Sequence, residues 1–456
     1  MSPRLKLLAL SSLAALAAAA QAPETTTPPA PPAPVIGERA SGAVAAPAAG
    51  GQAGFYLGVG NCLGSGCHGN SRAQTGGAVL QNEYYTWLRQ DPHQGAYDTL
   101  FEPRSQRIAA HLGVGKAHEE ALCLDCHTVN VAKEKRRGTL ALEDGVSCEG
   151  CHGPASGWRD THTDPSWTHA DSVAKGLLDL RSPAVRAQVC LGCHLGDGRR
   201  TVDHTLVAAG HPALAFELDN YSEEMNPHWK PEATPAMAAW AVGQVVSFRE
   251  GLEQLAGRAG SDRWPEFSDL SCYSCHHSLK GQQWQRAGIF SRRERPGLPP
   301  WSPARWAVLR QIVEQVAAGE RAGLDREVLE LAKAVERLNR PREVAASAER
   351  AAAALARVLP AVEAASWDPA KARRLLSTLA ADPDGWLAAD VHSAEQGFWA
   401  MQSLAGFLTG TDPRLAGGEL PRRLDRLHQS LNDPEGFDRS TYATLMGEVA
   451  RAAGGR

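Results

Sequence analysis

The sequence predicts a mainly α-helical protein in two parts, an irregular region rich in cysteine and histidine followed by a helical bundle. No segment of the 456 residues is rich in strand-forming residues. Residues 304–456 are rich in Ala, Leu and Arg, and their apolar side chains recur at a helical period. Residues 55–290 show only weak hydrophobic periodicity, but they carry ten cysteines in five pairs, each followed directly by a histidine. Together these three observations predict the fold class.

The first segment has the pattern of an export signal. Arg4 and Lys6 precede an apolar run of 14 residues that ends at Ala20, and a small residue, Ala22, fits a cleavage site. This predicts a secretory signal peptide over residues 1–22. The alternative is an uncleaved anchor, but the run is shorter than a membrane-spanning helix, which needs about 20 residues. We therefore expect a periplasmic or otherwise extracytoplasmic protein.

Residues 23–54 are rich in Pro, Ala, Gly and Thr and have few bulky apolar side chains. Such a composition cannot bury enough surface to offset the entropy of ordering, so it predicts a flexible leader.

The five cysteine units are typical of covalent c-type haem attachment. Two thiols reach two edges of one porphyrin, and the next residue, a histidine, lies beneath the iron as its axial ligand. Zinc knuckles, reactive dithiols and disulfides are the alternatives, but none requires a histidine directly after the second cysteine, and no cysteine lies outside a unit. The units are Cys62/Cys67/His68, Cys123/Cys126/His127, Cys148/Cys151/His152, Cys190/Cys193/His194 and Cys272/Cys275/His276.

We therefore expect five covalently bound haem c groups, with the five motif histidines as proximal iron ligands. The first unit has four residues between its cysteines, and Gly64 and Gly66 allow that longer loop to bulge. From Cys62 to His277 there are 216 residues, about 43 for each haem. The haems must then form much of the core of a pentahaem domain over residues 55–290, with short helices and loops around them.

The distal ligands decide what the irons can do. Nine histidines in this region lie outside the motifs, against two methionines, which favours bis-histidine haems of low potential. The nine are His93, His111, His118, His162, His169, His204, His211, His228 and His277.

Three of the nine are favoured as distal ligands. His93 follows Asp91-Pro92 and should lie in the first turn of a helix. His204 and His211 are seven residues apart, so on one helix they would face the same way, about 10 Å apart, and could serve two neighbouring haems. The other candidates are His162 or His169 as a fourth ligand and His118 as a fifth.

Residues 291–303 have the composition of a linker, and residues 304–456 predict five to seven helices in a bundle. Asp325 is the expected N-cap of one helix. Four Asp-Pro pairs suit an N-cap followed by proline at the first helical position. These pairs are Asp368-Pro369, Asp382-Pro383, Asp412-Pro413 and Asp433-Pro434.

Three segments resemble a known family. The strings at residues 145–155, 91–93 and 204–214 are similar to multihaem cytochromes related to the tetrahaem cytochrome c of ammonia oxidisers. That group is related in haem packing to hydroxylamine oxidoreductase and to pentahaem nitrite reductase. The resemblance covers residues 60–280 and implies an electron relay. The chain has five motifs where the tetrahaem relative has four, and every motif ends in histidine, whereas pentahaem nitrite reductases have a lysine in one.

The leading hypothesis is an electron carrier between redox partner proteins, periplasmic or membrane-bound, with the C-terminal helices as a docking or oligomerisation module. The alternative is a reductase or oxidoreductase of nitrite, hydroxylamine, nitric oxide or tetrathionate at one five-coordinate haem. Such a site would need cationic side chains, for which Arg159, His162, Arg199 and Arg200 are candidates. The net charge of −4 implies no nucleic-acid partner and membrane contact only transiently or through a partner.

Overall fold

The computed structural model describes residues 54–76, 79–225, 228–229, 236–272, 275–276, 300–302, 304–383, 385–433 and 436–454. The predicted signal peptide, nearly all of the leader and most of the linker at 291–303 lie outside these residues. Within them the chain is mainly α-helical, as predicted, and contains two isolated β-bridges but no strand. None of the described helices combines the length and the hydropathy that crossing a bilayer requires.

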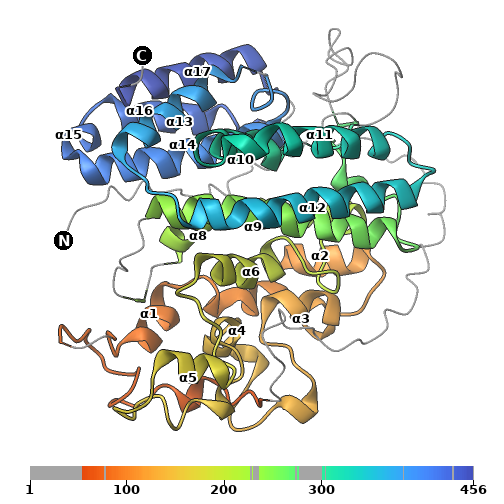
Figure 1. The fold of residues 1–456 in the computed structure, drawn as a ribbon. Coiled ribbons are helices and arrows are strands. Elements are labelled where there is room, and N and C mark those ends of the chain that lie inside the picture. The colour runs from red at the N-terminus through yellow and green to blue at the C-terminus, as the bar shows by residue number, and fades with distance from the viewer. Residues whose placement is uncertain are drawn as a thin grey trace, which may run out of the picture.

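The motif-bearing region is built from short helices joined by long loops (Figure 1). Its described α-helices are α1 (Glu83–Gln90), α2 (Pro103–His111), α3 (Ala121–His127), α4 (Cys148–His152), α5 (His169–Ala174), α6 (Pro183–His194), α7 (His204–Ala208) and α8 (Leu218–Glu224). The described 3-10 turns, η1 to η8, lie at Val59–Asn61, Gln94–Ala96, Asp98–Phe101, Ala117–Glu119, Lys133–Lys135, Leu142–Asp144, Ala155–Gly157 and Phe267–Asp269.

This region has little apolar core of its own. One small cluster of buried residues joins η3 to α2 and α3 around Leu100 and Ala109, and another joins α2 to α7 around Ile108 and Leu206. Each contains only four or five buried side chains among the described residues. This agrees with the expectation that large cofactors supply much of the packing.

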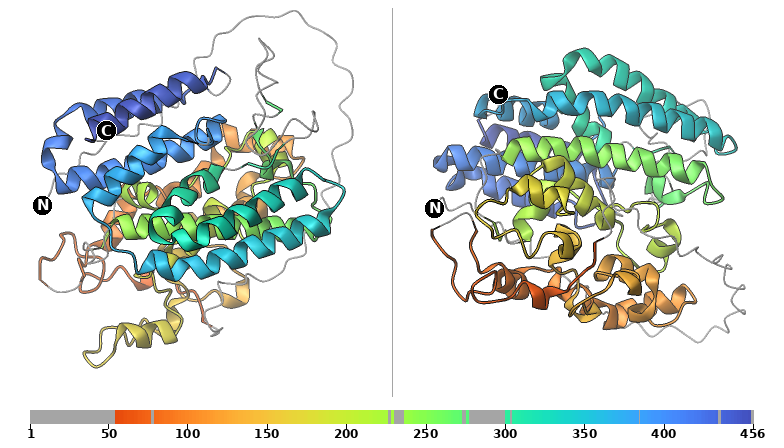
Figure 2. Two further views of the ribbon diagram at one scale, coloured as in Figure 1. Left: turned by 45° about the horizontal axis from the view of Figure 1, so that its top comes forward. Right: turned by 60° about the horizontal axis from the view of Figure 1, so that its bottom comes forward.

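The long helix α9 (Ala236–Ala259) joins the two parts of the chain. It packs against α6 on one side and against α12 and α10 on another, so that it lies between the short helices and the C-terminal ones (Figures 1 and 2). Trp240, Val245 and Val246 on α9 are completely buried. Burying one such side chain stabilises the fold by about 1.5–3 kcal/mol. One continuous apolar core therefore runs from α6 through α9 to the last helix.

The described residues of the C-terminal part form eight α-helices, where five to seven were expected. They are α10 (Ala304–Val316), α11 (Ala318–Val335), α12 (Pro341–Glu363), α13 (Pro369–Ala381), α14 (Val391–Thr411), α15 (Pro413–Ala416), α16 (Glu419–Gln429) and α17 (Arg439–Ala452).

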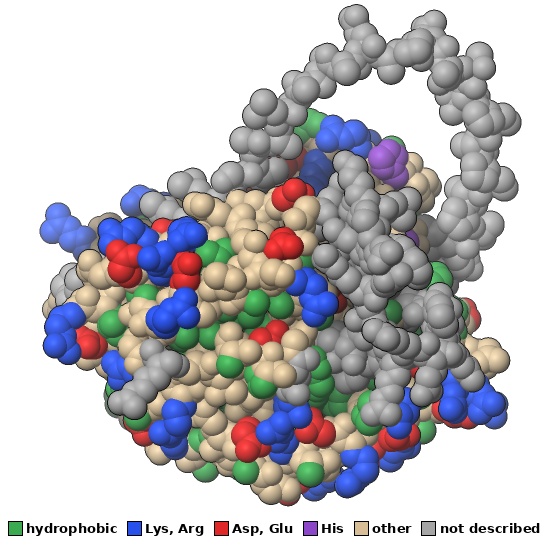
Figure 3. All heavy atoms as spheres, turned by 90° about the horizontal axis from the view of Figure 1, so that it is seen from above, with side chains coloured by type: hydrophobic (Ala, Val, Ile, Leu, Met, Phe, Trp, Pro, Cys, Tyr) green, Lys and Arg blue, Asp and Glu red, His purple; other side chains and the backbone are tan. Residues whose placement is uncertain are grey.

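On the face seen in Figure 3, acidic and basic side chains are mixed wherever grey atoms do not cover it. That visible surface therefore presents no large field of a single sign.

The predicted caps are right at two of the Asp-Pro pairs. Asp368 and Asp412 cap α13 and α15, and each side chain accepts a backbone N–H of the first turn. Asp382 instead ends α13 in a left-handed conformation, with φ of 37°. Asp433 accepts the N–H of Gly436, and Asp438 caps α17 in its place. Asp325 lies inside α11, so that predicted cap is wrong.

Two buried polar contacts connect the motif region to α14. The Asn220 amide of α8 donates to Ser403 Oγ at 2.9 Å and to the Trp399 carbonyl at 3.0 Å, while it also binds the Glu217 carboxylate. Next to the fifth motif, Ser271 Oγ donates to Asp390 Oδ2 at 2.9 Å, and Asp390 in turn caps α14. Both contacts satisfy polar groups that would be costly to bury alone.

Candidate haem sites

Four of the five motif histidines lie opposite a second imidazole. The distances between the paired ring centres fall within a narrow range. Each pair joins residues far apart in the sequence. The pairs are His68 with His162 at 6.2 Å, His194 with His93 at 6.0 Å, His152 with His228 at 6.3 Å, and His276 with His204 at 6.3 Å.

This spacing fits an iron between each pair. A metal–imidazole bond is about 2.0–2.1 Å long, and the ligating nitrogen lies about 1.1 Å from the ring centre. Twice the sum of these lengths separates the centres of two axial imidazoles by about 6.3 Å. Direct stacking of two rings would bring the centres closer, as in the 4.1 Å between Phe101 and His118. The four pairs therefore fit bis-histidine ligation, with the thiols of the same motif available for covalent attachment.

The motif helices explain how each site is built locally. α3, α4 and α6 each end at a motif histidine, so both cysteines and the histidine of a motif lie in the last helical turns. Cysteines three residues apart share one helix face, and the histidine follows at the helix end. α6 is held at its other end by Ser182, which caps it, and by Pro183 in its first turn.

The fifth motif is built as a single turn instead of a helix end. The backbone N–H groups of Cys275 and His276 both donate to the Cys272 carbonyl, at 3.1 and 2.8 Å. This turn places the two cysteines and the histidine close together, as haem attachment requires.

The cysteines of the fifth motif are more exposed than those of the three motifs before it. Cys275 and Cys272 are both exposed, whereas the cysteines of the second, third and fourth motifs are partly buried. A motif fixes its own turn, while burial of its thiols depends on neighbouring elements. Residues 273–274, inside the fifth motif, and the segment that follows it lie outside the described residues. Attachment of a haem to Cys275 and Cys272 therefore stays a prediction from the motif, supported by the pairing of His276 with His204.

Hydrogen bonds to Nδ1 orient several of the rings and leave Nε2 for a metal. Nδ1 of His68 lies 3.0 Å from Glu83 Oε2, and Nδ1 of His93 lies 2.8 Å from Asp91 Oδ1. Nδ1 of His162 contacts the carbonyl of Arg159. A carboxylate or carbonyl behind a ligating imidazole is the usual arrangement at metal sites.

These contacts also set the charge of the rings. The hydrogen bond from Glu83 raises the pKa of His68. Burial favours the neutral form of His93, but the Asp91 carboxylate outweighs it, so the pKa of His93 is raised. Burial lowers the pKa of His152 and of His194 to about 4, which keeps both rings neutral, the form that ligates metals.

Thiols of different motifs are neighbours. The Cys62 thiol lies beside the Cys148 thiol, and this interaction lowers the pKa of Cys62. The contact with Cys126 lowers the pKa of Cys193 to about 6 despite burial. The first motif thus lies beside the third, and the second beside the fourth. Burial and then the Cys190 thiol raise the pKa of Cys151, so the third motif also lies beside the fourth.

The second motif differs from the other four. Nδ1 of His127 lies 2.8 Å from the Ala96 carbonyl and 3.1 Å from Thr99 Oγ1, which leaves Nε2 for a metal. No described histidine ring lies opposite His127 as in the other pairs. Burial lowers the pKa of His211, and the charge of nearby His127 lowers it further. His211 is thus a neighbour of the second motif, and its Nδ1 contacts the Pro212 carbonyl at 2.8 Å.

The predicted distal candidates fall into two groups. His93, His162 and His204 each lie opposite a motif histidine, and His211 lies near the second motif. In contrast, Nε2 of His169 contacts Asp179 Oδ1 at 2.9 Å, and no described motif histidine lies opposite it.

His118 is also without a motif histidine opposite it in the described structure. Its ring stacks on Phe101, with Nε2 at 3.6 Å from Glu119 Oε1. His204 and His211 do not share one helix, because α7 ends at Ala208 and Gly210 follows with φ of 115°. His277 lies outside the described residues.

His228 was not selected as a distal candidate, yet it is the histidine opposite His152. Its Nδ1 is buried without a hydrogen-bond partner among the described residues. The sequence did contain a signal: Asn226-Pro227-His228 repeats the pattern of Asp91-Pro92-His93, which supplies another facing imidazole.

The arginines predicted to hold an anion are engaged elsewhere. Arg199 pairs with Asp125 at 2.8 Å, and Arg200 pairs with Asp197 at 2.6 Å and donates to Cys193 Sγ at 3.1 Å. Arg159 contacts Asp160 and the Asn61 carbonyl. These side chains therefore connect motifs and loops to one another.

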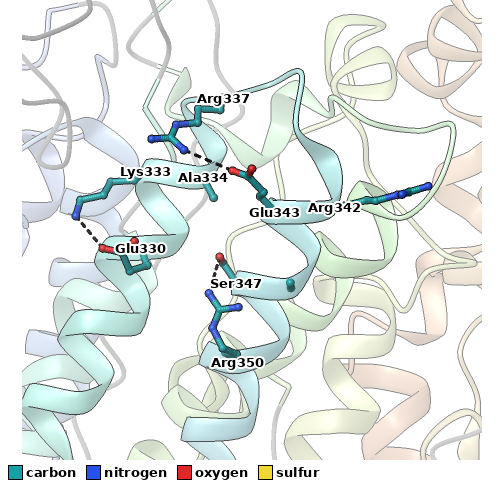
Figure 4. A pocket seen from close by; sticks show the side chains of 9 residues that line it. Glu330, Lys333, Ala334, Arg337, Arg342, Glu343, Ser347 and Arg350 are labelled. Atoms are coloured by element: carbon teal, nitrogen blue, oxygen red, sulfur yellow. Dashed lines mark hydrogen bonds and ion pairs between the residues drawn. The ribbon is translucent and has the colours of Figure 1, made fainter.

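A surface hollow of about 400 Å³ lies between α11 and α12, away from the motifs (Figure 4). Several of its charges are paired with one another, with Lys333 Nζ at 2.8 Å from Glu330 and Arg337 Nη1 at 3.5 Å from Glu343. No motif cysteine and no candidate ligand among the described residues lines it. The hollow is therefore not part of a haem site.

Residues 63–153 match the family model described as cytochrome c554 and c-prime. This segment contains the second and third motifs and most of the first. No curated protein and no solved structure matches the chain. The match supports a c-type cytochrome with covalently bound haem c, and it does not extend to the fourth and fifth motifs or to the C-terminal helices.

Proposed function

We propose that this protein is an extracytoplasmic pentahaem c-type cytochrome that transfers electrons between redox partner proteins through mostly bis-histidine haems. The observation that carries the proposal is the spacing of 6.0–6.3 Å between four motif histidines and a second imidazole. When bound, each haem c supplies a one-electron iron couple, and two imidazole ligands leave no open coordination position for a substrate.

The chain's own residues contribute ligand geometry and proximity. Asp91 and Glu83 hold the rings of His93 and His68 in one orientation through Nδ1, which limits ligand movement when the charge of the site changes. The thiol contacts between motifs connect the first site to the third, the third to the fourth and the fourth to the second. In the proposed relay, electrons pass between the first four sites in this order, which differs from the order in sequence.

The haem count and the spin states test the proposal. We expect the full-length protein, produced in a host that attaches haem c, to contain five haems by the pyridine haemochrome assay. Low-temperature electron paramagnetic resonance of the oxidised protein should show low-spin signals for at least four of them. Cys67→Ser and Cys275→Ser, at the two most exposed motifs, should each reduce the count from five to four. A count below five in the unaltered protein, or mainly high-spin iron, would contradict the proposal.

The location is tested separately. Mass spectrometry of the exported protein should find a new N-terminus near Ala22, and fractionation should recover the protein outside the cytoplasm.

We also propose that the helices from residue 304 onward serve in docking or oligomerisation. Size-exclusion chromatography with light scattering, with and without a candidate redox partner, tests this assignment.

His127 supports a second candidate function. Because no described imidazole lies opposite it as in the other pairs, the second site is the one at which a small nitrogen or sulfur compound could bind. A high-spin signal that shifts on addition of nitrite or nitric oxide, and that is lost in a variant unable to attach the second haem, such as Cys126→Ser, would favour this reductase. Five low-spin haems with no response would exclude it.

A further inference from the structure

Arg305 is a partly buried cation with which no described carboxylate forms an ion pair. It lies in the first turn of α10, and its Nη1 donates to Ser247 Oγ of α9 at 2.6 Å. Burial lowers the pKa of Arg305 to about 10. By comparison, Arg310 on the same helix pairs with Asp325 at 2.7 Å, and the buried Arg258 pairs with Asp269.

An unpaired guanidinium in such a place is costly, because removal from water is not offset by an opposite charge. A neutral serine satisfies one donor and leaves the charge uncompensated. Arg305 therefore lies where an anion would be favoured, and the dipole at the start of α10 adds to the positive potential there.

The surroundings of Arg305 lead to the fourth motif. Burial and then the Glu395 carboxylate raise the pKa of Tyr221, and the nearby charge of Arg305 opposes that shift. The ring of Tyr221 lies edge-on to the ring of His194, with 5.2 Å between their centres, and its hydroxyl donates to the Ala215 carbonyl. Tyr221 thus contacts the motif histidine of the fourth site and lies within electrostatic range of Arg305. Arg305 comes from the C-terminal helices, which carry no haem motif.

We propose that Arg305, held by Ser247, binds a propionate carboxylate of the haem whose axial ligands are His194 and His93. This rests on the proposed function only in requiring a haem at the fourth motif. Haem propionates are carboxylates at the ring edge, and a guanidinium binds a carboxylate through two parallel hydrogen bonds. The C-terminal helices would then contribute a charge to that haem and raise its reduction potential, because a nearby cation favours the form with the extra electron.

The test compares Arg305→Gln with Arg305→Lys and with Arg310→Gln, a control on the same helix. All are made in the full-length protein carrying His93→Met, which marks the fourth haem because methionine ligation raises its potential. We expect Arg305→Gln to lower the potential of the marked haem by about 59 mV, a tenfold change in the one-electron equilibrium. Arg305→Lys should keep most of the potential, and Arg310→Gln should leave it unchanged.

Three outcomes would overturn the proposal or separate it from the proposed function. Equal potentials in Arg305→Gln and its parent, with unchanged circular dichroism and five haems, would show that Arg305 binds no propionate. A wild-type potential that depends on added acetate or phosphate, and loses this dependence in Arg305→Gln, would show that the site holds a free anion instead. Absence of haem from the fourth-motif peptide in mass spectrometry would refute the proposed haem at that motif itself.

Discussion

Replacement of Glu149 by Gln should strongly destabilise the region around the first and third motifs. Glu149 lies between the two cysteines of the third motif and is only 3% exposed. Its carboxylate accepts the backbone N–H of Leu57 at 2.8 Å, of Gly58 at 2.7 Å and of Ala155 at 2.7 Å. It therefore holds the segment that leads into Cys62 against the third motif.

The magnitude follows from the three donors. Hydrogen bonds to a charged group contribute about 1.5–3 kcal/mol each, and a buried donor left unsatisfied costs about 1–3 kcal/mol. Glutamine keeps the shape but offers one carbonyl oxygen and directs an NH₂ group at N–H donors. We expect Glu149→Gln to lower the free energy of unfolding by about 2–4 kcal/mol, and Glu149→Ala by about 3–6 kcal/mol.

Denaturant titration of the haem-loaded protein, followed by Soret absorbance and circular dichroism, measures this loss. Glu330→Gln is the matched control, because Glu330 is about half exposed and pairs with Lys333 on the surface of α11. It should change the free energy of unfolding by less than about 0.5 kcal/mol. If Glu149→Gln fell within the same limit, the reasoning from buried donors would be refuted.

Three further predictions concern ligands and pH. His228→Ala should convert one haem from low-spin to high-spin in electron paramagnetic resonance, whereas His169→Ala should not; the reverse result would contradict the pairing of His228 with His152. Asp91→Asn removes the carboxylate behind a distal imidazole, so it should raise one reduction potential in a spectroscopic titration, because a less basic ligand stabilises the oxidised iron less. Burial raises the pKa of Asp269 to about 6, so the folded state binds its proton more tightly than the unfolded chain does. Its contribution to stability should therefore fall as pH rises from about 4 to about 6, and Asp269→Asn should remove that part of the pH dependence; parallel stability–pH curves for the two proteins would disprove it.

The motifs could be recognised because covalent haem attachment requires two cysteines and a histidine within a short local segment. The histidines opposite the motif histidines could not be predicted in the same way, since tertiary structure brings each pair together. His162 is 94 residues beyond His68, and His228 is 76 residues beyond His152. His169 lies close to the third motif in sequence, which favoured it as a ligand. In the structure its Nε2 contacts Asp179 instead. The exposure of Cys275 has the same origin, because no local pattern tells how much of a motif its neighbours cover.

The helical caps show the same limit. Asp368 caps its helix because the signal and its effect both lie within four residues. Asp382 has the same Asp-Pro pattern, but its carboxylate accepts the N–H groups of Trp386, Leu387 and Ala388 and so ends one helix instead of starting another. Asp325 pairs with Arg310 of the preceding helix, a contact that no local pattern reveals.

The position of α9 between the short helices and α12 has a consequence for the order of assembly. During synthesis α9 is complete about 80 residues before α12 begins, so the face of α9 that packs against α12 stays uncovered for that interval. All ten cysteines likewise precede α10 in the chain. Covalent attachment can therefore proceed while the motif-bearing segment is still open, and closure of the helical layer over α9 is the later event. A maturation defect in the C-terminal helices would then leave the haems attached but the protein prone to aggregate through α9.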